Sequence, residues 1–395
     1  MAKNDALGKA KEAKNDEFYT IYADIEKEMN AYLEYDENVF RGKTTLLPCD
    51  DPEWSNFTRY FAQNFEKLGL KKLISTSYAI ESKKYKVKDW QPTLFEQQAP
   101  WYDVDKSKIK GKIFTLDHDA NKNGRIDIED LEWKYLEGDG DFRSDEIKRL
   151  RDEADFVITN PPFSLFREFV AWIMESGKRF AVIGNMNAIT YKEIFPLLEK
   201  NKVWLGATIH SGDREFGVPK EYPLEAAGWR IDEKGNHFIR VKGVRWFTNI
   251  EHGRRHEPLS LMTETNNIKF SKHKDVKGLG YKKYDNYDAI DIPYTDAIPC
   301  DYDGVMGVPI SFLDKYCPEQ FEIIGCTEAG NDLCKKFYQD LHLVKNGISE
   351  YNMKSARYAP MVFHKEMPEG AYYTASNLNG FMTKSYFRIF IKSKK

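Results

Sequence analysis

Residues 154–185 read ADFVITNPPFSLFREFVAWIMESGKRFAVIGN, and this stretch decides the fold class. DFVIT at 155–159 is a short, β-branched apolar run of the kind that forms a buried strand. The segment SLFREFVAWIMESG that follows has apolar residues at helical spacing, and KRFAVIGN at 178–185 is a second strand candidate. Strand, helix and strand in this order predict a βαβ unit with parallel strands.

The same order occurs nearer the N-terminus. KTTLLP at 43–48 and KKLISTSY at 71–78 are predicted strands, and EWSNFTRYFAQNFEKLG between them is a predicted helix that ends at Gly69. A further helix is predicted from Asp16 to about Leu33. We therefore expect an α/β fold with an open, parallel, doubly wound sheet, whose ligands bind at the carboxyl edge of the strands.

The composition changes after VRWFTNI at 244–250, where Tyr, Asp, Lys and Pro become frequent and helical periodicity fades. We expect a domain boundary here, with one domain at 1–250 and a smaller, irregular domain at 251–395. The second domain is predicted to end in a strand at 386–393.

The totals exclude some classes of protein. No apolar run approaches the roughly 18 residues of a membrane helix, and the first twenty residues lack the apolar segment of a secretory signal. The five cysteines form no CxxC pair, which indicates reduced thiols and a cytoplasmic location. The net charge is −3, but basic clusters that could contact phosphates occur at 83–88, 106–112, 253–256 and 269–277.

A four-residue motif lies between the predicted strand at 155–159 and the helix that follows it. It consists of Asn160, Pro161, Pro162 and Phe163. The Asn160 side-chain oxygen and the Pro161 carbonyl are two acceptors, and the prolines offer no competing backbone donor. Such a pair suits both hydrogens of a planar NH₂ group, and Phe163 offers a face for stacking a heterocycle. The motif predicts alkylation of an amino nitrogen; the alternative is a proline-rich turn with a buried ring.

Longer strings point to one family. They are KNDEFYT, PCDDPEWSNF, GDGDFRSDE, ITNPPFSLFREF, IGNMNAITYKEIFP, YDNYDAIDIP, DGVMGVPISFLDKY and QFEIIG. In these strings the chain resembles the EcoRI-type adenine-specific DNA methyltransferases. The resemblance implies a Rossmann-like methyltransferase domain that uses S-adenosylmethionine (SAM), followed by a DNA-recognition region. It also implies methylation of the 6-amino group of an adenine flipped out of double-stranded DNA, with a restriction endonuclease for the same site as a candidate partner.

The resemblance also implies site residues. The clamp on the target adenine is Asn160, Pro161, Pro162 and Phe163, and the cofactor-binding residues are Tyr19, Thr20, Asp50, Asp51, Pro52, Asp141 and Phe142. Tyr19 and Thr20 would touch the methionine moiety, and an aspartate of the 50–51 pair its ammonium group. Asp141 would hydrogen-bond the cofactor's adenine, on which Phe142 would stack. The chain departs from the usual Asp-Pro-x-x-Gly-x-Gly loop, because DDPEWSNF has no glycine pair.

DANKNGRIDIED at 119–130, within an insertion at 117–133, follows the pattern of an EF-hand calcium loop. The candidate ligands of a structural calcium ion are Asp119, Asn121, Asn123, the Arg125 carbonyl, Asp127 and Asp130. Position 12 of the loop is Asp instead of Glu. The preceding KIFTL is predicted to be a strand and IEDLEWKYL the exiting helix; the alternative is an Asn/Gly turn without metal.

Two other functions remain open on sequence alone. The clamp could serve a methyltransferase that acts on RNA or on a protein glutamine, or the chain could be a calcium-stabilised binding module. The variant Asn160→Ala distinguishes the DNA adenine methyltransferase from the binding module. Loss of DNA methylation in a variant that still folds would favour the methyltransferase.

Overall fold

The computed structural model describes residues 19–50, 55–79, 97–210, 213–218, 228–327, 332–351 and 356–394. The chain divides into two compact units, one of Met1–Phe195 and Lys202–Gly253 and the other of Pro196–Asn201 and Arg254–Lys395. Both units contain helices and strands, so the predicted mixed α/β class is confirmed.

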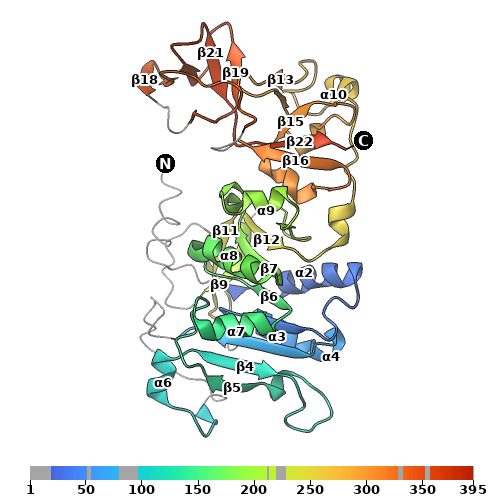
Figure 1. The fold of residues 1–395 in the computed structure, drawn as a ribbon, viewed down its shortest axis with the longest axis vertical. Coiled ribbons are helices and arrows are strands. Elements are labelled where there is room, and N and C mark those ends of the chain that lie inside the picture. Colours follow the sequence, from blue (N-terminus) through green and yellow to red (C-terminus); the bar gives the residue numbers. More distant parts are fainter. Residues whose placement is uncertain are drawn as a thin grey trace. The chain divides into compact units, whose positions relative to one another are not determined.

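An eight-stranded sheet forms the centre of the first unit, in the order β5-β4-β3-β2-β6-β7-β12-β8 (Figure 1). Its strands are β2 (Thr44–Leu47), β3 (Lys72–Ser77), β4 (Lys112–Leu116), β5 (Glu132–Tyr135), β6 (Phe156–Thr159), β7 (Arg179–Asn185), β8 (Trp204–Leu205) and β12 (Val244–Thr248). The four central strands β3, β2, β6 and β7 are parallel, which confirms the two predicted βαβ units. The expectation of a wholly parallel sheet is wrong, because β4 and β5 on one side and β12 and β8 on the other pair antiparallel.

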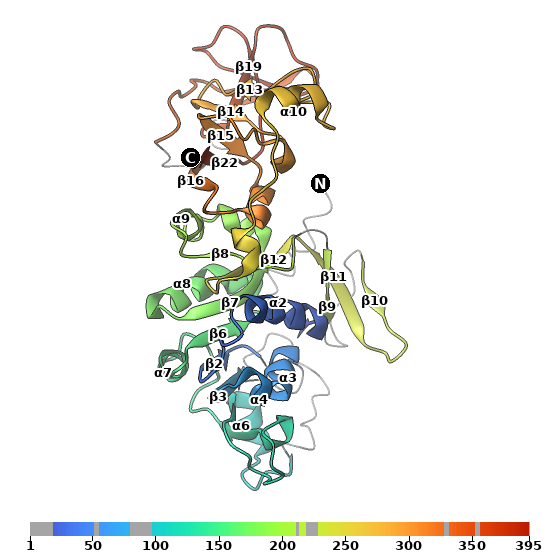
Figure 2. The ribbon, with the colours of Figure 1, turned by 90° about the vertical axis from the view of Figure 1, so that its right-hand side faces the viewer.

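Helices cover both faces of this sheet. Figure 2 shows α7 and α8 on one face and α2, α3 and α4 on the other. The helices of the unit are α2 (Tyr22–Tyr35), α3 (Asn56–Gln63), α4 (Phe65–Leu68), α6 (Val104–Ile109), α7 (Asp145–Glu153) and α8 (Phe166–Ser176). Ile25 and Met29 of α2 and Phe57 and Phe61 of α3 pack in one core with the inward side chains of the strands, including Phe156. Burial of such apolar faces is the main force that holds the layers together.

The ends of the first βαβ helix follow from sequence. The Ser55 side chain accepts a hydrogen bond from the Phe57 N–H and so caps the start of α3. Gly69 ends α4 in the left-handed conformation, at φ 62°, as predicted.

A second, four-stranded sheet carries the start of the described chain. β1 (Tyr19–Thr20) pairs with β9 (Asp213–Val218), which pairs with β11 (His237–Lys242), and β10 (Arg230–Ile231) forms the outer edge. The predicted helix from Asp16 therefore begins only at Tyr22, because Tyr19 and Thr20 are drawn into strand pairing with β9. Residues 16–18 lie outside the described part.

The other unit contains two five-stranded sheets. One has the order β13-β14-β15-β22-β16 and the other β18-β17-β20-β21-β19. Their strands are β13 (Lys282–Lys283), β14 (Ala289–Asp291), β15 (Val305–Val308), β16 (Phe321–Cys326), β17 (His342–Lys345), β18 (Ile348–Tyr351), β19 (Met361–His364), β20 (Tyr372–Thr374), β21 (Phe381–Lys384) and β22 (Ile389–Ser393), with helices α9 (Phe195–Glu199), which starts at the boundary, and α10 (Glu264–Phe270). Arg388 donates to the partly buried Asp291 at 2.9 Å, and Tyr284 donates to the same oxygen at 2.5 Å. The predicted last strand is β22.

Short 3₁₀ helices occur in both units. They are η2 (Ile128–Asp130), η3 (Phe163–Leu165), η4 (Met186–Thr190), η5 (Gly253–His256), η6 (Thr295–Ala297) and η7 (Ile310–Lys315). Among the described residues, no helix combines the length and the apolar character needed to cross a membrane.

Candidate active site

The carboxyl ends of β2 and β6 lie side by side in the middle of the eight-stranded sheet. The strands are parallel, and Thr45 of β2 pairs in register with Phe156 of β6. The chain leaves β2 toward α3 and β3 on one side, and leaves β6 toward α8 and β7 on the other. Open α/β sheets bind their ligands at such a reversal of strand order, so these two strand ends form the candidate active site.

The predicted clamp occupies the end of β6. Asn160 follows Thr159 directly, its side-chain oxygen is buried from solvent, and Pro161 is also buried. Phe163 begins the 3₁₀ turn η3 that leads into α8, and it is half-buried against the main core. Because neither proline has a backbone N–H, the acceptors at the end of β6 face no competing donor from 161 or 162.

Asp50 connects this position to the end of β2. One of its carboxylate oxygens accepts the Ser55 hydroxyl at 2.8 Å, and the other accepts the Thr159 hydroxyl at 2.5 Å. Asp50 is 6% exposed and Thr159 is fully buried. A predicted cofactor residue and the predicted clamp are therefore joined through one side chain, although they are far apart in the sequence. Asp51 and Pro52 lie outside the described residues.

Tyr19 and Thr20 reach the same neighbourhood through α3. The Asn56 side chain, in the first turn of α3, donates to the Thr20 carbonyl at 2.7 Å, and Asn56 follows Ser55, the partner of Asp50. The Thr20 hydroxyl is buried and has no hydrogen-bond partner among the residues that the structure describes. A buried polar atom of this kind is expected to meet a ligand or water.

Asp141 and Phe142 lie in the loop before α7, beside the end of β3. The Ala79 N–H donates to the Asp139 carbonyl at 2.8 Å, which ties the loop to the residues that follow β3. Burial, and then the charges of Asp139 and Asp141, raise the pKa of Tyr78 to about 12. Since β3 is the neighbour of β2, the GDGDF loop borders the sheet edge that holds Asp50.

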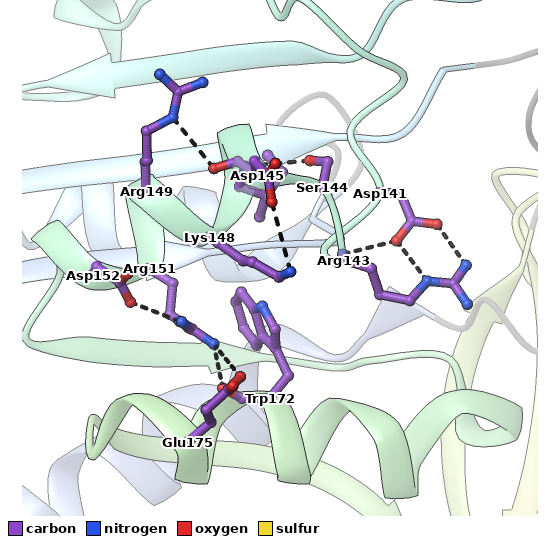
Figure 3. Close-up of polar contacts among 11 residues, drawn as sticks. Asp141, Arg143, Ser144, Asp145, Lys148, Arg149, Arg151, Asp152, Trp172 and Glu175 are labelled. Carbon is purple, nitrogen blue, oxygen red and sulfur yellow. Dashed lines mark hydrogen bonds and ion pairs between the residues drawn. The ribbon is translucent and has the colours of Figure 1, made fainter.

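The side chains of Asp141 and Phe142 already have partners in the protein. Figure 3 shows the Asp141 carboxylate paired with the Arg143 guanidinium, at 2.9 Å and 2.6 Å, and this pairing raises the pKa of Arg143. The Phe142 ring is 4% exposed and packs edge-on against Phe169 and Trp172. Contact of either side chain with a cofactor stays a prediction.

Sequence reasoning missed four residues of this region: Ser55, Ser75, Tyr78 and Thr159. Ser55 carried a signal, since a serine before an amphipathic run is a typical helix cap. The other three are ordinary strand or strand-end residues, and only their long-range contacts distinguish them.

Comparisons with known proteins identify the family of this chain. A family model described as "Adenine-specific methyltransferase EcoRI" matches residues 6–394. The chain is similar to the Type II methyltransferase M.EcoRI of Escherichia coli, with 42% identity over 323 residues, which are 82% of this chain and 89% of that relative. The chain belongs to the EcoRI-type adenine-specific methyltransferase family.

Two further relatives come from mycoplasmas. The Type II methyltransferases M.MpnI of Mycoplasma pneumoniae and M.MgeORF184P of Mycoplasma genitalium are each 34% identical over 323 residues. These residues are 81% of this chain and 85% and 86% of the two relatives. No solved structure matches the chain. The predicted family and the predicted enzyme class, an adenine-specific DNA methyltransferase, are confirmed.

In this EcoRI-type methyltransferase, the calcium-like loop lies in a β-hairpin between β4 and β5. The predicted exiting helix is wrong: Ile128–Asp130 form one 3₁₀ turn, and Glu132–Tyr135 form β5. The residues alternate between the two faces here, with Trp133 buried and its neighbours exposed, so pairing with β4 prevails over helical spacing.

The loop's polar side chains bind the loop's own backbone. Asp119 accepts the N–H groups of Asn123 and Gly124, and Asp130 accepts those of Asn121 and Asp127. The Asp127 and Asn121 N–H groups lower the pKa of Asp130. Within the described ranges, no group of three or more His, Cys, Asp or Glu side chains is arranged to hold a metal ion. The structure gives the calcium prediction no support.

Proposed function

We propose that this methyltransferase transfers the methyl group of SAM to the exocyclic 6-amino group of an adenine flipped out of duplex DNA. The observation that carries the proposal is the bond between Asp50 and Thr159. It brings Asp50, which we propose binds the cofactor, within one residue of Asn160 at the end of β6. A methyl donor and an acceptor amine would have to meet at such a point.

The residues present fit a SAM molecule. The methionine moiety carries an ammonium and a carboxylate group. The end of β2 offers the Asp50 carboxylate, and β1 offers the buried Thr20 hydroxyl, which has no hydrogen-bond partner among the described residues. Tyr19, Asp51 and Pro52 are proposed to complete this part of the pocket. Asp141 and Phe142 are proposed to border the adenine part, from the loop that packs on the end of β3. When bound, SAM supplies an electrophilic methyl group on its sulfonium.

The chain's own contribution is to hold and orient the amine. The Asn160 side-chain oxygen and the Pro161 carbonyl accept the two amino hydrogens, which favours a pyramidal nitrogen with its lone pair free for attack. The new bond forms between this nitrogen and the methyl carbon as the carbon–sulfur bond breaks, and the extra proton leaves the nitrogen for solvent. Phe163 stacks on the adenine. Positioning and exclusion of water supply the catalysis, so no covalent enzyme intermediate is required.

The proposal assigns a different role to each part of the chain. The unit around the eight-stranded sheet would be a Rossmann-like catalytic domain, at 1–250, and 251–395 would be the DNA-recognition region. Restriction–modification is the setting in which a Type II methyltransferase acts, so a restriction endonuclease for the same site would be its partner. The substrate would place the enzyme in the cytoplasm, with the DNA.

The proposal is tested with the purified protein, SAM labelled on its methyl group, and DNA from a host without methylation. Digestion of the DNA to nucleosides should recover the label as N6-methyl-2′-deoxyadenosine. Parallel reactions with RNA and with protein should stay unlabelled. Label in RNA, in glutamine or in N4-methylcytosine would contradict the proposal, and each outcome names the substrate that replaces adenine in DNA.

A further inference from the structure

Thr159 is the last residue of β6 and precedes the clamp residue Asn160. Its hydroxyl lies 2.5 Å from Asp50 Oδ2 and 2.5 Å from the Pro48 carbonyl oxygen, and it can donate to either acceptor. Thr159 is fully buried, so water does not compete for these bonds. A hydrogen bond to a carboxylate is among the stronger kinds.

The two acceptors flank a residue in an unusual backbone conformation. Cys49 lies between Pro48 and Asp50 and has φ 70°, in the left-handed region. This conformation is unfavourable for residues other than glycine, and it persists where the surroundings enforce it. One hydroxyl on β6 therefore lies within hydrogen-bond distance of both neighbours of Cys49, and it donates its single hydrogen to one of them at a time.

Asp50 extends the connection to two more elements. Its second carboxylate oxygen accepts the hydroxyl of Ser55, which caps α3, and its carbonyl accepts the hydroxyl of Ser75 in β3 at 2.8 Å. Ser75 in turn shares a 2.9 Å hydrogen bond with Thr58 of α3. The five side chains of this network are at most 6% exposed; they are those of Asp50, Ser55, Thr58, Ser75 and Thr159. A buried network that is fully bonded fixes the relative positions of its members.

A buried threonine in this sheet does not require such a bond. Thr45 of β2 and Thr76 of β3 are fully buried, and neither hydroxyl has a hydrogen-bond partner among the described residues. The bond of Thr159 is therefore a feature of its place beside Asp50 and Asn160.

We propose that Thr159 is a positioning residue that fixes the adenine clamp relative to the cofactor pocket by way of Asp50. This inference rests on the proposed function. It adds the residue that sets the distance between the adenine clamp and the cofactor pocket. A displacement of reacting groups by about 1 Å can reduce the rate roughly 100-fold. Loss of the hydroxyl is accordingly expected to slow methyl transfer more than it weakens SAM binding.

The test compares three variants of the full chain. Thr159→Val removes the hydroxyl and keeps the shape, and Thr159→Ser keeps the hydroxyl. Thr45→Val makes the same change at a buried threonine that has no hydrogen-bond partner in the described part of the chain. We expect kcat to fall about 10- to 100-fold in Thr159→Val, with a smaller change in the SAM Kd measured by calorimetry. Thr159→Ser should recover kcat to within about threefold of wild type, and Thr45→Val should match wild type.

Ser55→Ala provides the complementary measurement, since Ser55 donates to Asp50 Oδ1 whereas Thr159 donates to Asp50 Oδ2. It should raise the KM for SAM several-fold and leave kcat nearer to the wild-type value. Equal kcat values in Thr159→Val and Thr45→Val would overturn the inference. A Thr159→Val chain that fails to fold, while Thr159→Ser folds, would also overturn it, in favour of a purely structural hydroxyl. An inactive wild-type enzyme would instead contradict the proposed function.

Discussion

Gly140 lies so close to the end of β3 that a Cβ atom built on it would stand 2.3 Å from the Ser77 carbonyl oxygen. Its φ of 87° is also a conformation that other residues avoid. At Gly138, two residues earlier, a Cβ atom would meet one atom of the described residues within 4 Å, the Glu146 Oε2 at 4.0 Å. The two glycines form a matched pair on either side of Asp139.

Gly140→Ala should therefore push the GDGDF loop away from β3. Left-handed strain and steric overlap together are expected to lower the free energy of unfolding by about 2–4 kcal/mol. If this loop borders the cofactor pocket, the SAM Kd should rise by roughly tenfold, which corresponds to about 1.4 kcal/mol. Denaturant unfolding and calorimetry check both effects, with Gly138→Ala as the control. Identical SAM affinities for the two variants would remove the loop from the pocket.

Substitution of Tyr78 is a milder change at the same contact between the end of β3 and the GDGDF loop. It hydrogen-bonds Asp139, and its raised pKa of about 12 keeps the phenol protonated. Tyr78→Phe should cost about 1 kcal/mol of stability and raise the KM for SAM a few-fold, with kcat close to wild type. Tyr135→Phe, which removes a hydroxyl bonded to Ser107 at 2.6 Å, should cost similar stability and leave the KM unchanged.

The raised pKa also gives a pH dependence. Because the folded-state pKa of Tyr78 lies above the ordinary value of 10, its contribution to stability is complete below pH 10 and is lost as the pH rises toward 12. The stability difference between wild type and Tyr78→Phe should shrink across this window. A difference that stays constant from pH 9 to about pH 12 would contradict a Tyr78 pKa raised by burial and by the charges of Asp139 and Asp141.

Glu28 is a fully buried carboxylate on α2 that holds the segment after β8. It accepts the backbone N–H groups of Ala207 and Thr208, at 2.8 and 2.9 Å, and the hydroxyls of Thr208 and Tyr32. Glu28→Gln places an NH₂ group against one of the backbone donors. We expect a loss of about 1–3 kcal/mol in unfolding free energy, and almost none for Glu26→Gln on the exposed side of α2.

The sign of the pH dependence is fixed by burial, which raises the pKa of Glu28 above 4.5. A raised folded-state pKa means that the folded protein holds its proton more tightly than the unfolded chain. The stability of wild type relative to Glu28→Gln should thus be greatest at and below pH 4.5, and should decline as the pH rises through the folded-state pKa. A relative stability that increases with pH over this range would show that the carboxylate is not desolvated.

Calcium is tested by metal removal. Because Asp119 and Asp130 already accept backbone N–H groups, we expect the melting temperature to differ by less than about 2 °C between chelator and millimolar calcium. Asp119→Ala should behave the same in both conditions. A saturable stabilisation by calcium that Asp119→Ala abolishes would restore the assignment made from the loop pattern.

Individual strands and helices could be predicted from the sequence where the spacing of apolar residues is regular over a short segment. DFVIT and the helix after it have the spacing of a buried strand and an amphipathic helix, and Asn160 was placed correctly at the end of β6. The segment Glu132–Tyr135 was predicted wrongly because its pattern fits a strand as well as a helix, and pairing with β4 decides between them. The bond from Thr159 to Asp50 spans 109 residues, so no local pattern contains it.

Sequencing the genome of a methylation-free host that expresses the chain tests the central claim most directly. Wild type should leave N6-methyladenine at one short DNA motif, and Asn160→Ala should reduce that modification by at least about 100-fold. Asn249→Ala is the control: its amide bonds the Phe180 N–H, where β7 begins at the opposite edge of the sheet. It should leave the motif methylated. A wild-type genome without modified adenine, or equal methylation in Asn160→Ala, would contradict the account.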